Sequence, residues 1–346
     1  MTLLARSPLH EAHQRLGARF THFGGWEMPL QYRGALAEHG AVRSSVGAFD
    51  VSHLGRFALD GSGAVAAVDR LLSNDLNRIE PGRAQYSLML DERGGVIDDI
   101  ILWWSTAGRL IVLPNAANHD RVRHAFVVQP DCAVTDLRPD TVLLAVQGPG
   151  SAQVLETVIG ECPKRFRVLE GDGWTAAGTG YTGESGAEVM LPIETASSVF
   201  EALITAGAEP CGLASRDILR LEMGYPLWGQ DIDHTTSPLE AGLEWAVGWD
   251  HEFVGRGALA ALRHRPLDRA LIGFALEGRR VPRTGYTVRS EGRSGRVTSG
   301  NFSPALGVGI GLAYVSPPAR AGEPMAMAIR DEWVPGRFVD PPFVRR

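Results

Sequence analysis

Residues 86–103 read YSLMLDERGGVIDDIILW, two apolar runs joined by a polar turn that ends in two glycines. This pattern predicts a β-hairpin with a glycine turn. Neighbouring side chains of a strand point to opposite faces, so Asp98 and Asp99 face opposite ways. Both faces are otherwise apolar, and an unpaired charge in such surroundings costs several kcal/mol. At least one of these carboxylates must therefore meet polar partners.

Two interpretations of this acid pair stay open from the residues alone. In the first, backbone amides or an arginine satisfy a structural carboxylate. In the second, one acid is held ready in a ligand cleft as a proton donor or acceptor.

The rest of the pattern indicates an α+β fold. Apolar residues recur at helical spacing over 35–46, 65–72 and 195–206, and residues 141–146 predict another strand. Strands and helices alternate without the regular rhythm of a doubly wound sheet. From about Arg263 onward, short apolar runs separated by Gly- and Arg-rich turns predict a separate C-terminal β-domain.

Two further segments are rich in chemistry-bearing residues. Residues 178–188 read GTGYTGESGAE, and their glycines permit either close approach of the backbone to a ligand or a tight hairpin before the strand at 189–191. Residues 215–222 read SRDILRLE and resemble a helix start, with Ser215 as the N-cap and Asp217 in the first turn. Arg216 could equally bind an anionic ligand.

Composition excludes several classes of function. The chain has 346 residues, 44% of them hydrophobic and 21% charged, with a net charge of −6 and no basic stripe for nucleic acid. No apolar run approaches the length of a membrane span or of a signal peptide. Three widely spaced cysteines are typical of a reducing cytoplasm. The histidines lack metal-ligand spacing, so we expect no metal and interpret His53 and His119 as hydrogen-bonded structural residues.

An ordered set of motifs now resembles the aminomethyltransferase family, the T-proteins of the glycine cleavage system. The resemblance extends over about 8–344. The motifs are Phe23-Gly24-Gly25-Trp26, Phe49-Asp50-Val51-Ser52-His53, Gly94 to Asp99, Ala145 to Pro149, Gly180 to Glu184, Ser215 to Glu222, Gly229-Gln230-Asp231 and Thr298 to Pro304. Trp228, Asn301 and Ala305 depart from residues common in that family.

The resemblance implies three domains in a cloverleaf around a central folate channel, with a C-terminal β-barrel-like domain. Its expected boundaries are 1–50 with 140–245 for the folate-binding domain, 51–139 for the domain with the acidic hairpin, and 246–346 for the β-rich domain. It also implies the reaction. The methylene carbon of an aminomethyl group on the dihydrolipoyl H-protein passes to tetrahydrofolate with release of ammonia, a step of glycine catabolism that uses no flavin.

Site residues follow from the same resemblance. The catalytic aspartate falls on Asp99, and the acid that anchors the pterin ring falls on Glu188, whose carboxylate can accept paired hydrogen bonds from an amino-pyrimidine edge. The remaining residues expected around the folate are Tyr86, Asn115, Tyr181, Arg216 and Tyr225. An ionised Asp99 in a dry site can take up a proton and offset positive charge, which a neutral amide cannot.

Two other functions compete with this one. A folate-dependent demethylase of an N-, S- or O-methyl donor would share the folate half of the site. A non-catalytic folate-binding factor of iron-sulfur assembly would resemble the chain in fold, but it carries a cysteine that residues 222–231 lack.

Overall fold

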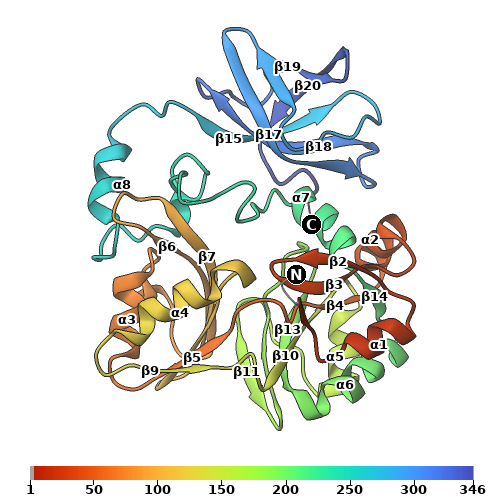
Figure 1. The fold of residues 1–346 in the computed structure, drawn as a ribbon, viewed down its shortest axis with the longest axis vertical. Coiled ribbons are helices and arrows are strands. Elements are labelled where there is room, and N and C mark those ends of the chain that lie inside the picture. Colours follow the sequence, from red (N-terminus) through yellow and green to blue (C-terminus); the bar gives the residue numbers. More distant parts are fainter. Residues whose placement is uncertain (1–3, 346) are drawn as a thin grey trace. The chain divides into compact units, whose positions relative to one another are not determined.

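The computed structural model describes residues 4–345. Residues 1–3 of the expected folate-binding domain and residue 346 of the expected β-rich domain therefore lie outside the described residues. The chain forms two compact units. The first unit comprises the residues up to Met89 together with Asp98–Arg216, and the second comprises Leu90–Ile97 together with Asp217–Arg346. Figure 1 traces their helices and strands. The expected division into three domains, with boundaries at residues 50, 139 and 245, stays a prediction.

A six-stranded sheet forms the larger part of the first unit. Its order is β11 (Val168–Gly171), β12 (Trp174–Ala177), β13 (Gly186–Pro192), β10 (Thr141–Gln147), β4 (Gly47–Asp50) and β14 (Glu209–Cys211). The central strand β10 is an almost continuous apolar run, as expected for a strand buried on both faces. Helices α5 (Ser151–Ile159) and α6 (Ile193–Thr205) lie against β10 and β13 (Figure 1) and complete a core around Leu144, Val189 and Phe200.

A small three-stranded sheet lies before β4 in the chain. Its order is β1 (Ala5–Arg6), β3 (Trp26–Gln31) and β2 (Arg19–Phe23), and the helices next to it in the chain are α1 (His10–Arg15) and α2 (Ala35–Ser44). The loop between β2 and β3 is Gly24-Gly25, with φ of 55° and 85°. Two positive φ angles are what a two-residue hairpin turn of type I′ requires, so this motif is explained by chain geometry.

A five-stranded sheet makes up the rest of the first unit and contains the acidic strand, except that the tip of its β6–β7 hairpin, Leu90–Ile97, is assigned to the second unit. Its order is β6 (Arg83–Leu90), β7 (Val96–Thr106), β8 (Arg109–Leu113), β5 (Phe57–Asp60) and β9 (Ala133–Asp136), with α3 (Ala64–Leu71), α4 (His119–Val127), η1 (Leu76–Arg78) and η2 (Ala116–Asn118) in its connections. The predicted hairpin is confirmed as β6 and β7. Its turn is closed by Asp91, whose carboxylate accepts from the amides of Arg93 and Gly95 at 2.9 and 2.8 Å.

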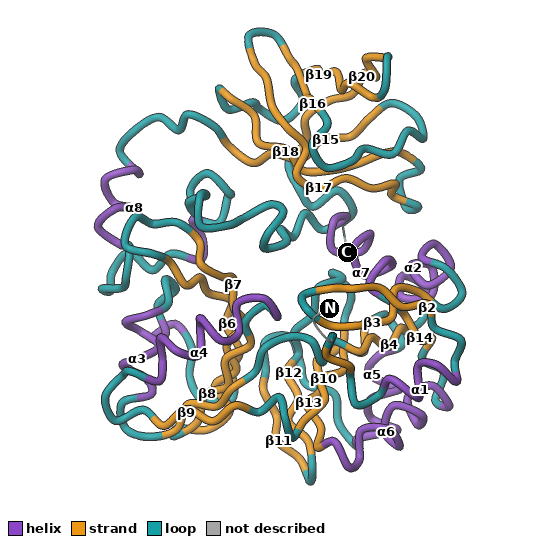
Figure 2. The backbone as a smooth tube through the Cα atoms, viewed as in Figure 1, coloured by secondary structure: helices purple, strands orange, loops and turns teal. Residues whose placement is uncertain are grey.

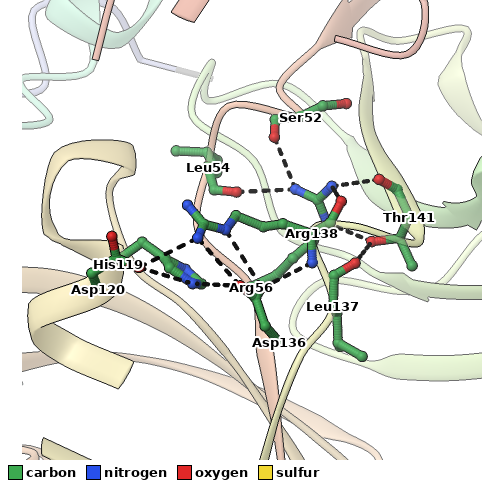
Figure 3. A network of polar contacts seen from close by, with 9 residues as sticks. All are labelled: Ser52, Leu54, Arg56, His119, Asp120, Asp136, Leu137, Arg138 and Thr141. Atoms are coloured by element: carbon green, nitrogen blue, oxygen red, sulfur yellow. Dashed lines mark hydrogen bonds and ion pairs between the residues drawn. The ribbon is translucent and has the colours of Figure 1, made fainter. Parts of the chain in front are cut away.

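Arg56 joins the two segments through which the chain passes between these two sheets. Its guanidinium is buried and donates to the carbonyls of Ser52 and Leu54 on one segment and to Thr141 on the other (Figure 3). Burial, which is the largest effect, lowers the pKa of Arg56 to about 10, so the group remains a cation at neutral pH. A buried cation that donates to several acceptors holds both of these chain segments in place.

The second unit contains a closed barrel. Its strands, in barrel order, are β15 (Ala270–Leu276), β18 (Val308–Ser316), β17 (Arg293–Ser303), β16 (Thr287–Ser290), β19 (Pro324–Ile329) and β20 (Glu332–Val339). Figure 2 shows this part as strands and loops, with α8 (Arg256–Arg263) and η3 (Glu244–Ala246) preceding it in the chain. The fold is therefore mixed α+β with a C-terminal barrel, as predicted.

Most predicted elements are confirmed, and one detail is wrong. The spacing over 35–46, 65–72 and 195–206 corresponds to α2, α3 and α6. Helix α7 (Leu213–Glu222), however, begins before Ser215, so Ser215 is not its N-cap and Asp217 does not lie in its first turn. In the part of the chain that the structure describes, no helix is long and apolar enough to cross a membrane.

Candidate functional site

Strand β7 separates its two acids as the alternation of a strand requires. Asp98 is fully buried on the face that also carries Val96, Ile100 and Leu102, whereas Asp99 is partly exposed on the other face. The two carboxylates therefore meet different surroundings, although they are neighbours in the chain.

Asp98 is the structural carboxylate. Its oxygens accept from the backbone N–H and the side-chain amide of Asn115 at 2.9 and 2.8 Å, and from the side-chain amide of Asn118 at 2.7 Å. Burial, and then the charge of Asp99, raise the pKa of Asp98 well above its usual range, and these donors oppose the rise. The polar partners are thus amides and not the arginine considered above.

Asp99 shares the donor Asn115 with Asp98 and also accepts from Tyr86. Its Oδ1 accepts from the side-chain amide of Asn115 at 2.7 Å, and its Oδ2 accepts from the hydroxyl of Tyr86 at 3.3 Å. Burial, and then the charge of Asp99, raise the pKa of Tyr86 well above its usual range, so Tyr86 remains a donor. Asn115 directly precedes η2, and its one side-chain amide donates to both acids. It therefore holds Asp99 in place.

Glu188, Arg216 and Tyr181 form a second group in the first unit. Glu188 on β13 is buried and accepts from the hydroxyl of Thr179 at 2.6 Å, while Arg216 Nη2 lies 3.8 Å from its other oxygen. The Arg216 guanidinium lies 5.1 Å from the ring centre of Tyr181 and 5.9 Å from that of Phe49. Burial, the largest effect, lowers the pKa of Arg216, whose Nη1 is buried without a hydrogen-bond partner in the described structure.

Hydrogen bonds from other parts of the chain hold the Gly-rich segment 178–188 in place. Gln147 accepts from the hydroxyl of Thr182 and donates to the carbonyl of Thr179, while Arg43 on α2 donates to the carbonyl of Thr182 at 2.7 Å. A Cβ at Gly180 would overlap the Gln147 side chain. The glycine at 180 is therefore required for packing against Gln147, and the segment connects β12 and β13 as a hairpin loop.

Electrostatics connect the two groups. The charge of Tyr181 contributes to raising the pKa of Tyr86, behind burial and Asp99. Burial, and then Arg216, lower the pKa of His53 to about 3, so this imidazole is neutral at physiological pH. The Nδ1 atoms of His53 and His119 are both buried without a hydrogen-bond partner among residues 4–345. The contact of His119 Nε2 with Asp136 at 3.2 Å confirms the expected hydrogen bond for His119, and for His53 it stays a prediction.

Tyr225 belongs to the second unit, where a buried ion pair fixes its backbone. Arg220 and Asp231 are joined at 2.8 Å with side chains only 2% and 0% exposed, and Arg220 also donates to the Tyr225 carbonyl at 3.0 Å. Ser299 on β17 adds a hydroxyl to the same carboxylate at 2.8 Å. The sequence motifs around residues 220, 231 and 299 are thus connected by this ion pair and by the Ser299 hydrogen bond.

Sequence reasoning missed Asn118, Thr179 and Phe49. Thr179 stands in the quoted Gly-rich segment, and its position nine residues before Glu188 carries no signal by itself. Asn118 follows Asn115 at a spacing of one helical turn, which was the available signal for a shared acceptor.

Family comparisons agree along the length of the chain. The family description "GCVT N-terminal domain" matches residues 9–251, and "Glycine cleavage T-protein C-terminal barrel domain" matches residues 269–345. The chain belongs to the glycine cleavage T-protein family.

Relatives in this family match over nearly their whole length. The chain is 43% identical to the aminomethyltransferase of Synechococcus elongatus, covering 99% of this chain and 96% of the relative. It is 46% identical to the aminomethyltransferase of Rubrobacter xylanophilus, covering 99% and 95%. A crystal structure of the glycine cleavage system aminomethyltransferase T from Bartonella henselae has a TM-score of 0.92 at 34% identity, with 99% of this chain and 98% of that one covered.

Proposed function

We propose that this T-protein family member is an aminomethyltransferase of glycine catabolism. It transfers the methylene carbon of the aminomethyl group on the dihydrolipoyl arm of the H-protein to tetrahydrofolate, and ammonia leaves. Relatives named aminomethyltransferase match the whole chain at 43% and 46% identity, which favours this reaction over a demethylase or an iron-sulfur assembly factor. The observation that carries the proposal is the difference between the two neighbouring acids: Asp98 is a fully buried structural carboxylate, whereas Asp99 is held by Asn115 on the partly exposed face of β7.

The residues of the second group suit a reduced folate. Glu188 keeps acceptor capacity beyond its bond to Thr179, and the buried Nη1 of Arg216 has a donor to spare among the described contacts. A pterin offers an amino-pyrimidine edge of donors that such a carboxylate can accept in charge-assisted bonds. We assign Glu188 as the anchor of the ring and Arg216, Tyr181 and Tyr86 as residues around the folate.

When bound, tetrahydrofolate supplies the nucleophilic nitrogen. Asp99 Oδ2 accepts from the Tyr86 hydroxyl at 3.3 Å on the partly exposed face of β7, and we assign that oxygen to receive the proton of the attacking nitrogen or to offset iminium-like charge. Asn115 keeps Oδ1 in place, and Asp98 keeps Asn115 in place in turn. We retain Tyr225 as a folate residue from the family resemblance.

The lipoylated H-protein is the proposed partner, and we propose a cytoplasmic location. The three cysteines, Cys132, Cys162 and Cys211, are all free in the structure, as is usual in a reducing compartment.

One assay with two donors tests the function. The purified chain is given tetrahydrofolate and either aminomethylated H-protein or a methylated amine such as dimethylglycine. The expected products with H-protein are methylene-tetrahydrofolate and one ammonia per transfer. Methyl-tetrahydrofolate formed from the methylated amine, with no product from the H-protein, would make the protein a demethylase, and folate binding without turnover of either donor would make it a binding factor.

A further inference from the structure

The first turn of α7 is capped from another helix. Glu38 on α2 is fully buried, and its Oε2 accepts from the backbone N–H of Gly212 at 2.9 Å and from the hydroxyl of Ser215 at 3.1 Å. An acid at a helix N-terminus satisfies free N–H groups and is stabilised by the helix dipole. Glu38 therefore performs the capping role that the local sequence assigned to Ser215.

The other oxygen of Glu38 fixes the entrance to its own helix. Oε1 accepts from the backbone N–H groups of Tyr32 and Gly34 at 2.6 and 3.1 Å. One buried carboxylate thus ties the end of β3, the start of α2 and the start of α7 together.

Arg216, the residue after Ser215, pairs with Glu188 at 3.8 Å and lies against the rings of Tyr181 and Phe49. Its buried Nη1 has no hydrogen-bond partner within the described residues, so no such bond fixes where this donor points. The direction of this donor therefore depends on the position of the backbone of residue 216. That backbone is the turn that Glu38 caps.

We propose that Glu38 is a positioning residue for folate binding and acts by fixing the first turn of α7, so that Arg216 meets the ligand. This inference rests on the proposed folate site and deepens it. Removal of the carboxylate leaves the chemistry of Asp99 in place but lets the Arg216 guanidinium lose its alignment. The defect therefore belongs to folate binding and not to the rate of transfer at saturating folate.

Glu38→Gln and the milder Ser215→Ala test this proposal by direct titration of tetrahydrofolate. An amide at residue 38 has one acceptor oxygen instead of two. Its NH2 group would face backbone N–H groups, which are also donors. We expect the Kd of folate to rise about tenfold in Glu38→Gln, or about 1.4 kcal/mol, and about threefold in Ser215→Ala, with kcat at saturating folate within about twofold of wild type.

Glu240→Gln is the matched control, because Glu240 also accepts from a backbone N–H and a serine hydroxyl, both of Ser237, and contacts none of the assigned folate residues. It should lower the melting temperature and leave the Kd of folate unchanged. An equal rise of Kd in this control would overturn the proposal, because the effect would then follow general stability.

A double-mutant cycle with Arg216→Ala separates positioning from general structure. If Glu38 acts through Arg216, then Glu38→Gln raises the Kd of folate in the wild-type background and has no further effect in Arg216→Ala. Multiplicative effects, or an unchanged Kd in both Glu38→Gln and Ser215→Ala, would contradict the proposal. Wild-type protein that binds no tetrahydrofolate would instead refute the proposed function, so the two failures are distinct.

Discussion

Asn115→Ala is the most informative change to the acidic strand, because one amide serves both carboxylates. The variant loses the bonds to Asp98 at 2.8 Å and to Asp99 at 2.7 Å, and it keeps the backbone N–H to Asp98 at 2.9 Å. Hydrogen bonds to charged groups contribute about 1.5–3 kcal/mol each when buried, and less where water reaches the acceptor, as at Asp99. We expect a loss of about 2–4 kcal/mol in the free energy of unfolding near neutral pH.

The pH dependence of this loss has a definite sign. The pKa of Asp98 is raised in the folded state, by burial first, so the stability that it contributes is present below the unfolded pKa and is lost as pH rises through the folded pKa. Removal of a donor raises that pKa further. The deficit of Asn115→Ala relative to wild type should therefore be larger at about pH 8 than at about pH 5.

Urea denaturation at both pH values measures the deficit. Asn118→Ala is the matched control, since it removes one bond to Asp98, at 2.7 Å, and leaves the bonds of Asn115 and Tyr86 to Asp99 in place. It should lose about half as much stability and retain most transferase activity. An equal deficit at both pH values, or a larger one at low pH, would refute the argument that Asn115 stabilises ionised carboxylates.

Three further predictions follow from single contacts. Thr179→Ala removes the 2.6 Å bond to Glu188 and should raise the Kd of tetrahydrofolate about threefold to tenfold with kcat unchanged, as steady-state kinetics with a folate titration will show. Arg56→Met should cost about 3–5 kcal/mol in urea unfolding, because several buried acceptors lose their donor, whereas Arg138→Gln at a more exposed position should cost less than about 1 kcal/mol. Burial would raise the pKa of Asp50, but the hydrogen bond and charge pairing with a buried histidine lower it to about 2. The stability that this carboxylate adds to the fold is present above its unfolded pKa, so wild type should lose about 2 kcal/mol of unfolding free energy as pH falls from about 5 to 2. Asp50→Asn should lack this acid-dependent loss.

The sequence predicted the features that depend on local spacing. Alternation along 96–103 was enough to place Asp98 and Asp99 on opposite faces and to require polar partners for one of them. The glycine turn, the helices α2, α3 and α6, and the C-terminal barrel follow from periodicity and turn residues in the same way.

Features that join distant parts of the chain were not predictable from local pattern. Ser215 is a residue type that local rules favour as an N-cap, yet Glu38, 177 positions earlier in the chain, takes that role. The partner of Asp98 was expected to be a backbone amide or an arginine, and it is instead supplied in part by the side chains of Asn115 and Asn118, which only the pairing of β7 with β8 brings near. Tertiary contacts of this kind override local propensity.

Asp99→Asn tests the central claim most directly, because it replaces a carboxylate oxygen by an amide of the same size. The measurement is the single-turnover rate of methylene-tetrahydrofolate formation from aminomethylated H-protein, with the Kd of tetrahydrofolate determined on the same preparation. We predict a Kd within about twofold of wild type and a rate lower by a factor of about 10²–10⁴, the usual contribution of a positioned acid or base. A variant that binds folate normally and transfers the methylene carbon at close to the wild-type rate would contradict the assignment of Asp99 as the catalytic anion.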